Sequence, residues 1–262
     1  LMGLVRAHLA ENDVEGALAL VREETAQRPD NPLAHLLTAQ LERRLDRTQA
    51  AVAAYRRAID LQPEWATPYR ELAALHEAAG DPRSAMQVLD AGSRAGAAPE
   101  DLLLRKAFVQ QRSDDVEGAI ATYARMLDAG VETDVVVNNY AALVADFAPQ
   151  DTAKLERALA LAERFNTSDE AYFVDTLGWL QHRLGNSAEA VALLRRAAAM
   201  RPDDAQIRYH LAAAFDAAGE PDLARREVER ALVDGADYPG IEDARALRDT
   251  LAAEEQAEVV TE

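Results

Sequence analysis

Small and apolar residues recur along this 262-residue chain at the spacing of packed helices, and the arrangement repeats about every 34 residues. Ala17, Ala51, Ala85 and Ala119 are separated by this one constant interval, and so are Ala190 and Ala224. An apolar residue follows each alanine by four positions, which places both on one face of a helix. These apolar residues are Val21, Tyr55, Leu89, Tyr123, Leu194 and Val228. The pattern predicts a series of stacked helix pairs.

A short turn is predicted between the two helices of each pair, five positions before the repeated alanine. The turn position holds Asn12, Asp46, Gly80, Asp114, Gly185 and Gly219. Gly, Asn and Asp are the residues that most readily adopt the left-handed backbone conformation that ends many helices. In Gly80-Asp81-Pro82 and Gly219-Glu220-Pro221, an acidic N-cap and a proline in the first turn are predicted to begin the second helix.

The register slips once, because the interval from Ala119 to Ala190 is three positions longer than two periods. We expect the extra residues in the loop near 146–151 and a slightly shortened linker near 166–169.

The C-terminal segment does not follow the repeat pattern. Tyr238-Pro239-Gly240 precedes a mostly polar stretch with one narrow apolar stripe, which predicts a capping helix. The predicted organisation is one solenoid domain over residues 1–237, irregular near 146–169, a capping helix over 238–256 and a frayed tail over 257–262.

These recurring positions resemble those of the tetratricopeptide-repeat (TPR) family over nearly the whole chain. The match is fullest in the sixth repeat, where Leu177-Gly178 precede Ala190 and Pro202 follows it by twelve positions. The resemblance implies an all-α, right-handed superhelix (an α-solenoid) of about seven helix pairs plus a C-terminal capping helix. The family's first-helix Trp is absent from its position, which holds Leu1, His35, Tyr69, Leu103, Val137, Val174 and Arg208.

Charge and composition narrow the classes of partner. The chain has 46 acidic and 28 basic side chains and a formal net charge of -18, which repels nucleic acid and anionic lipid. It has no Cys, so disulfides and thiolate metal sites are excluded. No apolar run approaches the roughly 18–20 residues of a membrane helix. We therefore expect no nucleic-acid partner and no direct membrane insertion. The first residue is Leu1, so we expect a piece of a longer or processed protein.

No motif predicts catalysis, a cofactor or a metal. The segment from His76 to Gly80 begins like a zinc-protease helix, but Gly80 stands where the second His ligand would be. Most of the 46 carboxylates are expected on solvated helix faces. The prediction is that the chain is not an enzyme.

The family geometry implies a concave groove lined by the first helix of each pair. The candidate partner-binding residues on it are Arg6, Gln40, Arg43, Arg70, Phe108, Asn138, Tyr172, Asp175, Trp179, His182 and Tyr209. Arg6, Arg43 and Arg70 could form a cationic strip for an acidic peptide or an anionic polymer. The alternative is that they pair with acidic residues of neighbouring repeats.

The aromatic residues of the groove also have two interpretations. Trp179, Tyr172, Tyr209 and Phe108 could form an exposed floor that stacks on sugar rings or peptide side chains, or they could pack between repeats. A TPR clamp for the acidic C-termini of chaperones is not expected. Arg6 and Gln40 occupy positions where that clamp needs Asn, and the only lysines are Lys106 and Lys154.

Three segments of the C-terminal half carry a narrower resemblance, to bacterial TPR proteins of exopolysaccharide export and exosortase (PEP-CTERM) systems. They are Val137-Asn138-Asn139-Tyr140-Ala141, Asp175-Thr176-Leu177-Gly178-Trp179 and Ile207-Arg208-Tyr209-His210-Leu211-Ala212. The resemblance implies a bacterial scaffold in the periplasm or envelope.

The predicted function is a non-catalytic scaffold that holds a protein or peptide in the groove. Two alternatives are a regulatory or substrate-presenting module of a larger glycosyltransferase or protease, and a sugar-binding solenoid that contacts polysaccharide. A monomer or a weak homodimer is expected.

Overall fold

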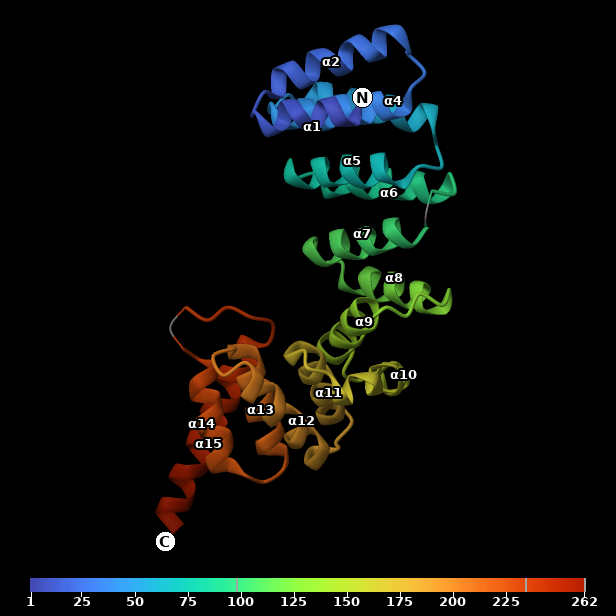
Figure 1. Ribbon diagram of the computed structural model, residues 1–262. Coiled ribbons are helices and arrows are strands. Elements are labelled where there is room, and N and C mark those ends of the chain that lie inside the picture. Colours follow the sequence, from blue (N-terminus) through green and yellow to red (C-terminus); the bar gives the residue numbers. More distant parts are fainter. Residues whose placement is uncertain (98, 234, 262) are drawn as a thin grey trace. The chain divides into compact units, whose positions relative to one another are not determined.

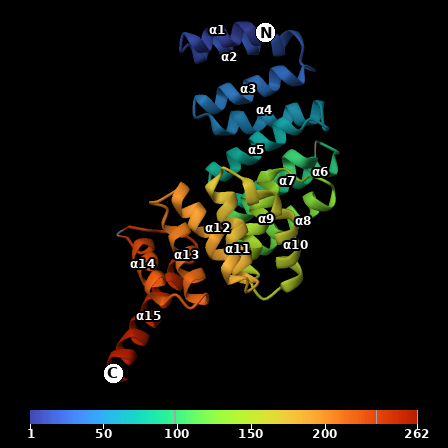
Figure 2. The same ribbon diagram turned by 60° about the horizontal axis from the view of Figure 1, so that its bottom comes forward.

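A computed structural model describes residues 1–97, 99–233 and 235–261 (Figures 1 and 2). Over these residues the chain contains α-helices and one 3-10 helix, and no strand. This confirms the all-α solenoid of helix pairs. The contacts divide the chain into two compact units, Leu1–Met126 and Leu127–Glu262, whereas the sequence predicted a single domain.

The first unit contains three complete helix pairs and the greater part of a fourth. The helices are α1 (Met2–Ala10), α2 (Val14–Gln27), α3 (Pro32–Arg44), α4 (Thr48–Leu61), α5 (Ala66–Ala78), α6 (Pro82–Arg94), α7 (Pro99–Arg112) and α8 (Val116–Asp128). The two helices of each of the first three pairs lie side by side (Figure 1). Each helix of these pairs also contacts the one that follows it, so the core extends from pair to pair.

The second unit contains three further pairs and a last helix. The elements are α9 (Asp134–Phe147), α10 (Thr152–Ala162), the 3-10 helix η1 (Glu163–Thr167), α11 (Ala171–Arg183), α12 (Ser187–Met200), α13 (Ala205–Ala217), α14 (Pro221–Ala231) and α15 (Ile241–Thr261).

The alanines that recur once per period are where the second helix of each pair meets its neighbours. All six are fully buried, at 0% exposure. A side chain of one methyl group lets two helices approach closely, and the larger residue four positions later fills the space beside it. In the sixth pair Gly178 has a similar role, because a Cβ there would lie 2.7 Å from Leu194 Cγ. Close approach of α11 and α12 therefore depends on Gly178.

The turns between paired helices have the predicted backbone. Gly80, Gly185 and Gly219 have φ of 73°, 81° and 74°. The three positions with a side chain, Asn12, Asp46 and Asp114, have φ of 60°, 58° and 57°. The left-handed turn is thus confirmed at all six positions.

The two predicted N-caps differ. The Asp81 carboxylate accepts a hydrogen bond from the backbone N–H of Ser84 at 3.0 Å, as a side-chain cap should. Glu220 makes no such bond. Pro82 and Pro221 both lie in the first turn of their helices.

The irregular fifth pair is longer than the others at two points. In the fifth pair the first helix begins at Asp134 and the second at Thr152. This interval is two residues longer than in the second pair, where the helices begin at Pro32 and Thr48. This agrees with extra residues near 146–151. The linker prediction was wrong in direction, because the segment from Thr152 to Ala171 is one residue longer than the matching segment of the second pair.

The 3-10 helix η1 accommodates the longer linker. Its Phe165 is buried and stacks on Phe173 of α11, with 4.5 Å between the ring centroids. The linker therefore contributes a side chain to the packed core of the second unit.

The last helix covers the end of the second unit. Helix α15 contacts α13 and α14 and buries Ala244 and Leu251 completely. Before it, Gly240 has a φ of 91°, and a Cβ there would lie 2.9 Å from Tyr209 Cε1. The helix continues to Thr261, beyond the predicted end at 256, and residue 262 of the predicted tail lies outside the described residues.

None of the described helices combines the length and the apolarity needed to cross a membrane.

Candidate partner-binding site

Two pockets are lined mainly by first-helix residues, one in each unit. In the first unit, a pocket of about 260 Å³ lies between α1 and α3. We call it the arginine pocket, and its lining residues are Met2, Val5, Arg6, Leu9, Leu37, Gln40, Leu41, Arg43 and Arg44. Three of the predicted residues, Arg6, Gln40 and Arg43, are thus brought to one place.

The arginine pocket has an apolar base and a cationic rim. Val5, Leu37 and Leu41 are buried, whereas all three arginines are exposed. Within the described part of the chain, the side chains of Arg6 and Arg43 make no hydrogen bond or ion pair. Unpaired guanidinium groups remain available for an acidic ligand, to which they can donate two parallel hydrogen bonds.

The other predicted residues of the first unit lie elsewhere. Arg70 does not line the arginine pocket, and its Nη1 lies 3.4 Å from Asp101 Oδ2 on α7. For Arg70 the structure therefore favours pairing with a neighbouring repeat. Phe108 is 44% exposed, with the guanidinium of Arg105 5.3 Å and that of Arg112 5.8 Å from the ring centroid.

In the second unit, a pocket of about 170 Å³ is formed by α9, α11 and α13. We call it the Asp-His pocket, and its lining residues are Asn138, Ala142, Asp146, Tyr172, Asp175, Thr176, Trp179, Gln206 and His210. Four of the predicted residues, Asn138, Tyr172, Asp175 and Trp179, are brought together here. These α-helices are the first helices of the fifth, sixth and seventh pairs.

Two carboxylates of this pocket are held by ring N–H groups. Trp179 Nε1 donates to Asp146 Oδ1 at 2.7 Å, which joins α11 to α9. His210 Nδ1 lies 3.0 Å from both oxygens of Asp175, which joins α13 to α11. The rings of Trp179 and His210 are stacked with centroids 4.1 Å apart. The carboxylates are therefore fixed by three neighbouring first helices.

The aromatic residues are mostly packing residues. Trp179 is 2% exposed and Tyr209 is 6% exposed, and their rings meet edge to face at 5.7 Å. For these two residues the structure favours packing between repeats over an open aromatic floor. Tyr172 is 47% exposed, and its hydroxyl donates to Asp204 and accepts from Arg201, each at 3.0 Å.

Burial shifts the pKa of several ionisable groups of this region, among them Asp146 and His182. Desolvation raises the pKa of Asp146, although the nearby His210, the bond from Trp179 and the charge of Arg183 act in the opposite direction. The pKa of His182 is lowered to about 4, chiefly by desolvation and also by the neighbouring Arg183 and His210. His182 stacks on Trp179 at 4.7 Å, and its Nδ1 has no hydrogen-bond partner among the described residues.

The His182 ring predicts a loss of stability in mild acid. Its pKa is about 4 in the folded chain and about 6.5 when solvated, so the unfolded state takes up the proton first as the pH falls. This contribution to stability is complete above about pH 6.5 and is lost progressively toward pH 4. Because the ring is partly exposed, we expect a loss of about 1–2 kcal/mol between pH 6.5 and 5.

Urea unfolding of the parent chain and of His182→Phe, each at about pH 7 and pH 5, measures this term. The phenylalanine can keep the stacking on Trp179 but cannot be protonated. Between pH 7 and pH 5 the variant should therefore lose about 1–2 kcal/mol less stability than the parent. Equal losses in the two proteins would show that His182 does not titrate in this way.

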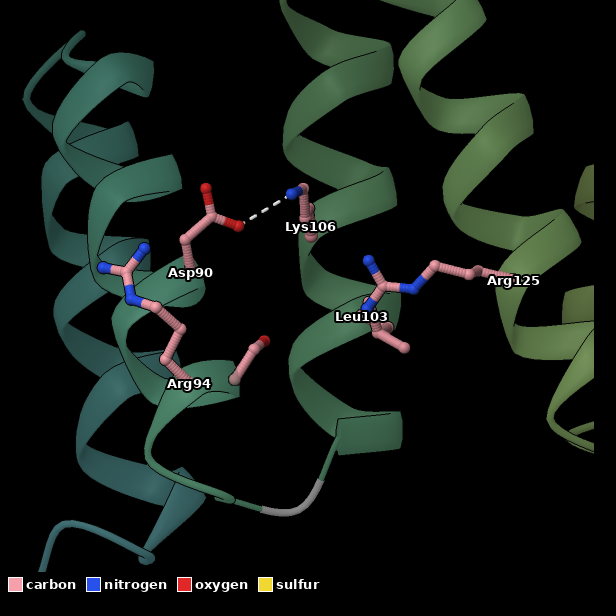
Figure 3. Close-up of a pocket in the computed structure, with 6 residues that line it drawn as sticks. Asp90, Arg94, Leu103, Lys106 and Arg125 are labelled. Atoms are coloured by element: carbon pink, nitrogen blue, oxygen red, sulfur yellow. Dashed lines mark hydrogen bonds and ion pairs between the residues drawn. The ribbon is translucent and has the colours of Figure 1, made fainter.

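A third pocket, of about 260 Å³, lies between α6, α7 and α8 in the first unit (Figure 3). Lys106 Nζ reaches across from α7 to Asp90 Oδ1 on α6, at 2.7 Å, and Arg94 and Arg125 flank the same space. Two of its three helices are second helices, so this pocket is not part of the surface predicted from the sequence.

Several functional candidates were missed at the sequence level. Asp146 lies in the last turn of α9, beyond the positions counted along the first helix, although Trp179 donates to it. His210 belongs to the segment Ile207–Ala212, and a lone His gives no signal in the sequence of its distant partner Asp175. Arg44 could have been found, because it follows Arg43 in the last turn of α3.

A family model described as tetratricopeptide repeat matches residues 2–64 and 176–240. These matches support the TPR family. The matched segments lie at the two ends of the chain, and the described helix pairs between them follow the same design. No curated protein matches the chain.

Several solved structures share the fold at low sequence identity. A tetratricopeptide repeat protein from Parabacteroides merdae is 15% identical, with a TM-score of 0.54 over 96% of this chain and 97% of its own. MamA from Desulfovibrio magneticus, from residue 41 onward, is 14% identical, with a TM-score of 0.54 over 64% of this chain and 93% of its own. A chain of the Cut9-Hcn1 hetero-tetramer of the APC/C is 13% identical, with a TM-score of 0.53 over 94% of this chain and 48% of its own. Such identities show the fold alone.

Proposed function

We propose that this chain is a non-catalytic scaffold that binds segments of partner proteins on the first-helix surfaces of both units. The observation that carries the proposal is that the two pockets described above are formed by the first helices of consecutive pairs. TPR solenoids bind protein partners, and the Cut9-Hcn1 hetero-tetramer is an assembly of protein chains built on a similar fold. The helical backbone of the binding surface is preformed, so binding orders the partner segment and the side chains that contact it but not the scaffold backbone.

The arginine pocket indicates what one partner segment contains. Its buried apolar base suits an aliphatic or aromatic side chain, and the guanidinium groups of Arg6 and Arg43 suit a carboxylate beside it. The amide of Gln40 is already engaged, because its Nε2 donates to Glu71 Oε1 at 2.8 Å. We therefore assign an acidic residue next to an apolar residue to this pocket.

The double variant Arg6→Ala/Arg43→Ala is expected to weaken binding of acidic peptides at least tenfold. Each hydrogen bond between ionised groups is worth about 1.5–3 kcal/mol, and tenfold corresponds to about 1.4 kcal/mol. Peptides are first selected on the whole chain from a random phage-displayed library. Their affinity is then measured by fluorescence anisotropy at low and high salt, since an ionic contact weakens as salt screens it.

The control is Arg56→Ala/Arg57→Ala, which changes the net charge equally on the exposed face of the second helix α4. This variant should retain affinity. Selection of no peptide, or an equal loss in both double variants, would refute the proposal for the arginine pocket.

We also propose, as the more specific role, a place in bacterial exopolysaccharide assembly or export, in the periplasm or envelope. Its support is the resemblance of three short segments in the second unit to TPR proteins of those systems. Affinity capture from envelope fractions tests it with the parent and the Arg6→Ala/Arg43→Ala variant as baits. Recovery of polysaccharide-export proteins by the parent and not by the variant supports the role, and recovery of none of them by the parent contradicts it.

A sugar-binding function has less support. Sugar rings stack on open aromatic faces, and both Trp179 and Tyr209 are buried.

A further inference from the structure

The Asp-His pocket presents hydrogen-bond acceptors that lack matching donors. Two carboxylates line it, those of Asp146 and Asp175, and no Lys or Arg is among its lining residues. Asp146 receives one hydrogen bond at Oδ1, from Trp179, which leaves Oδ2 for another donor. Two carboxylates without a basic lining residue favour a cation at this part of the surface.

Two further lining residues have a buried polar atom without a partner. Asn138 Oδ1 and His210 Nε2 are both shielded from solvent, and neither is hydrogen-bonded within the described residues. Because His210 Nδ1 faces the Asp175 carboxylate, Nδ1 carries the proton, and in the neutral ring Nε2 is an acceptor. The whole His210 side chain is 3% exposed. Buried acceptors without donors are unfavourable, and a ligand with N–H groups would relieve this.

The aromatic ring beside these acceptors is closed to stacking ligands. The indole of Trp179 is stacked on His210 at 4.1 Å and on His182 at 4.7 Å, and the guanidinium of Arg183 lies 4.2 Å from its centroid. Arg183 itself is turned to the backbone, where its Nε donates to the carbonyl of Ala145 at 2.9 Å. A nucleobase or a sugar ring therefore has no free face of the Trp179 indole to stack on.

The size of the pocket restricts the ligand further. About 170 Å³ is below the roughly 300–1,000 Å³ of pockets that enclose drug-sized molecules. It suits a single side chain. The half-exposed lining residue Tyr172 keeps the pocket in contact with solvent, so an incoming segment can reach it.

We propose that the Asp-His pocket receives one lysine or arginine side chain of a bound partner segment. A lysine ammonium has three donors and no acceptor, and a guanidinium has five donors and no acceptor, so either complements the unpartnered atoms of Asp146, Asn138 and His210. This inference rests on the proposed function and identifies a residue type for it. The two pockets then select opposite charges, an acidic residue in the first unit and a basic residue in the second.

The test uses the whole chain carrying Arg6→Ala/Arg43→Ala, so that peptide selection reports on the rest of the surface. Peptides from the same random library are expected to share a Lys or Arg. Replacing that residue by norleucine or citrulline should weaken binding at least tenfold. Asp146→Asn should weaken binding of the basic peptide at least tenfold and leave binding of the norleucine or citrulline peptide unchanged. The carbonyl oxygen of the new asparagine can still accept the Trp179 N–H, so the variant is expected to fold.

The matched control is Asp216→Asn, an equal charge change at an exposed position of α13 outside the pocket. It should bind the basic peptide as the parent does. The indole N–H signal of Trp179 in an NMR spectrum gives a local readout, because Trp179 donates to Asp146 and the only other Trp, Trp65, lies in the first unit. The basic peptide should shift the Trp179 signal and not that of Trp65.

The outcomes separate this inference from the proposed function. Peptides that bind without a basic residue, or equally well to Asp146→Asn, overturn the basic-side-chain assignment and leave partner binding intact. If neither the parent chain nor the Arg6→Ala/Arg43→Ala chain selects a peptide, the proposed function and this inference both fail.

Discussion

Replacing Arg208 by alanine is expected to lower the free energy of unfolding of the second unit by about 3–5 kcal/mol. Arg208 is 7% exposed, and its Nη1 donates to Glu227 Oε2 at 2.7 Å. Its Nε and Nη2 donate to the carbonyl of Pro202 at 2.9 and 2.8 Å. The variant leaves a partly buried carboxylate and a carbonyl without these donors and creates a cavity, and each effect destabilises the fold.

The chain offers a matched control for this prediction. Arg230 pairs with the same carboxylate, with 3.3 Å between its Nη1 and Glu227 Oε1, but its side chain is half exposed. Arg230→Ala should therefore lose less than about 1 kcal/mol. Urea unfolding followed by Trp179 fluorescence, in a Trp65→Phe background, measures both variants in the second unit. Equal losses would show that the burial of Arg208 does not determine its contribution.

Deleting residues 238–262 is expected to lower the free energy of unfolding of the second unit by about 4 kcal/mol. The deleted segment contains Leu251, which is fully buried, and Tyr238, which is nearly so, and each large buried apolar side chain contributes roughly 1.5–3 kcal/mol. It also removes the carbonyl of Leu251, to which Arg225 Nη1 donates at 3.3 Å. The surfaces of α13 and α14 that contact α15 would then be exposed to water.

A shorter truncation distinguishes the loss of the capping contacts from the loss of C-terminal residues in general. Removing residues 252–262 keeps Ala244 and Leu251 and should change the free energy of unfolding by less than about 1 kcal/mol. Both deletions are compared by thermal and urea unfolding. An unchanged stability after removal of 238–262 would contradict the capping role of α15.

The fold could be predicted from the sequence because its rules are local and repeated. Six turn positions needed a left-handed backbone and held only Gly, Asn or Asp. The buried alanines marked the second helix of six pairs, at a constant interval on either side of the fifth pair. The extra residues near 146–151 followed from counting alone. The longer linker after α10 did not, because a 3-10 helix with a buried Phe165 depends on tertiary packing that no local pattern encodes.

The candidate site could be predicted only in part. Counting along first helices selected Arg6 and Arg43, which line one pocket of the structure, and Asp175 and Trp179, which line another. It could not tell that Trp179 would be buried. That outcome depends on rings from two helices, His182 and His210, covering the indole. From the sequence alone, Trp179 is therefore compatible with an exposed position on the groove and with a position in the core.

The spacing of first helices also bears on how such a chain can lengthen or shorten during evolution. Successive first helices begin one full period apart from Pro32 to Ala66 and again from Ala171 to Ala205, whereas the step from Asp134 to Ala171 is three residues longer. If a block of one period is inserted or deleted among the regular pairs, every repeated alanine keeps its buried position between the helices. The same block taken across the fifth pair would be three residues short, and these residues would be missing from the loop near 146–151 and from the linker that contains η1. Recombination within the gene is therefore expected to be tolerated between regular repeats and rejected across the fifth.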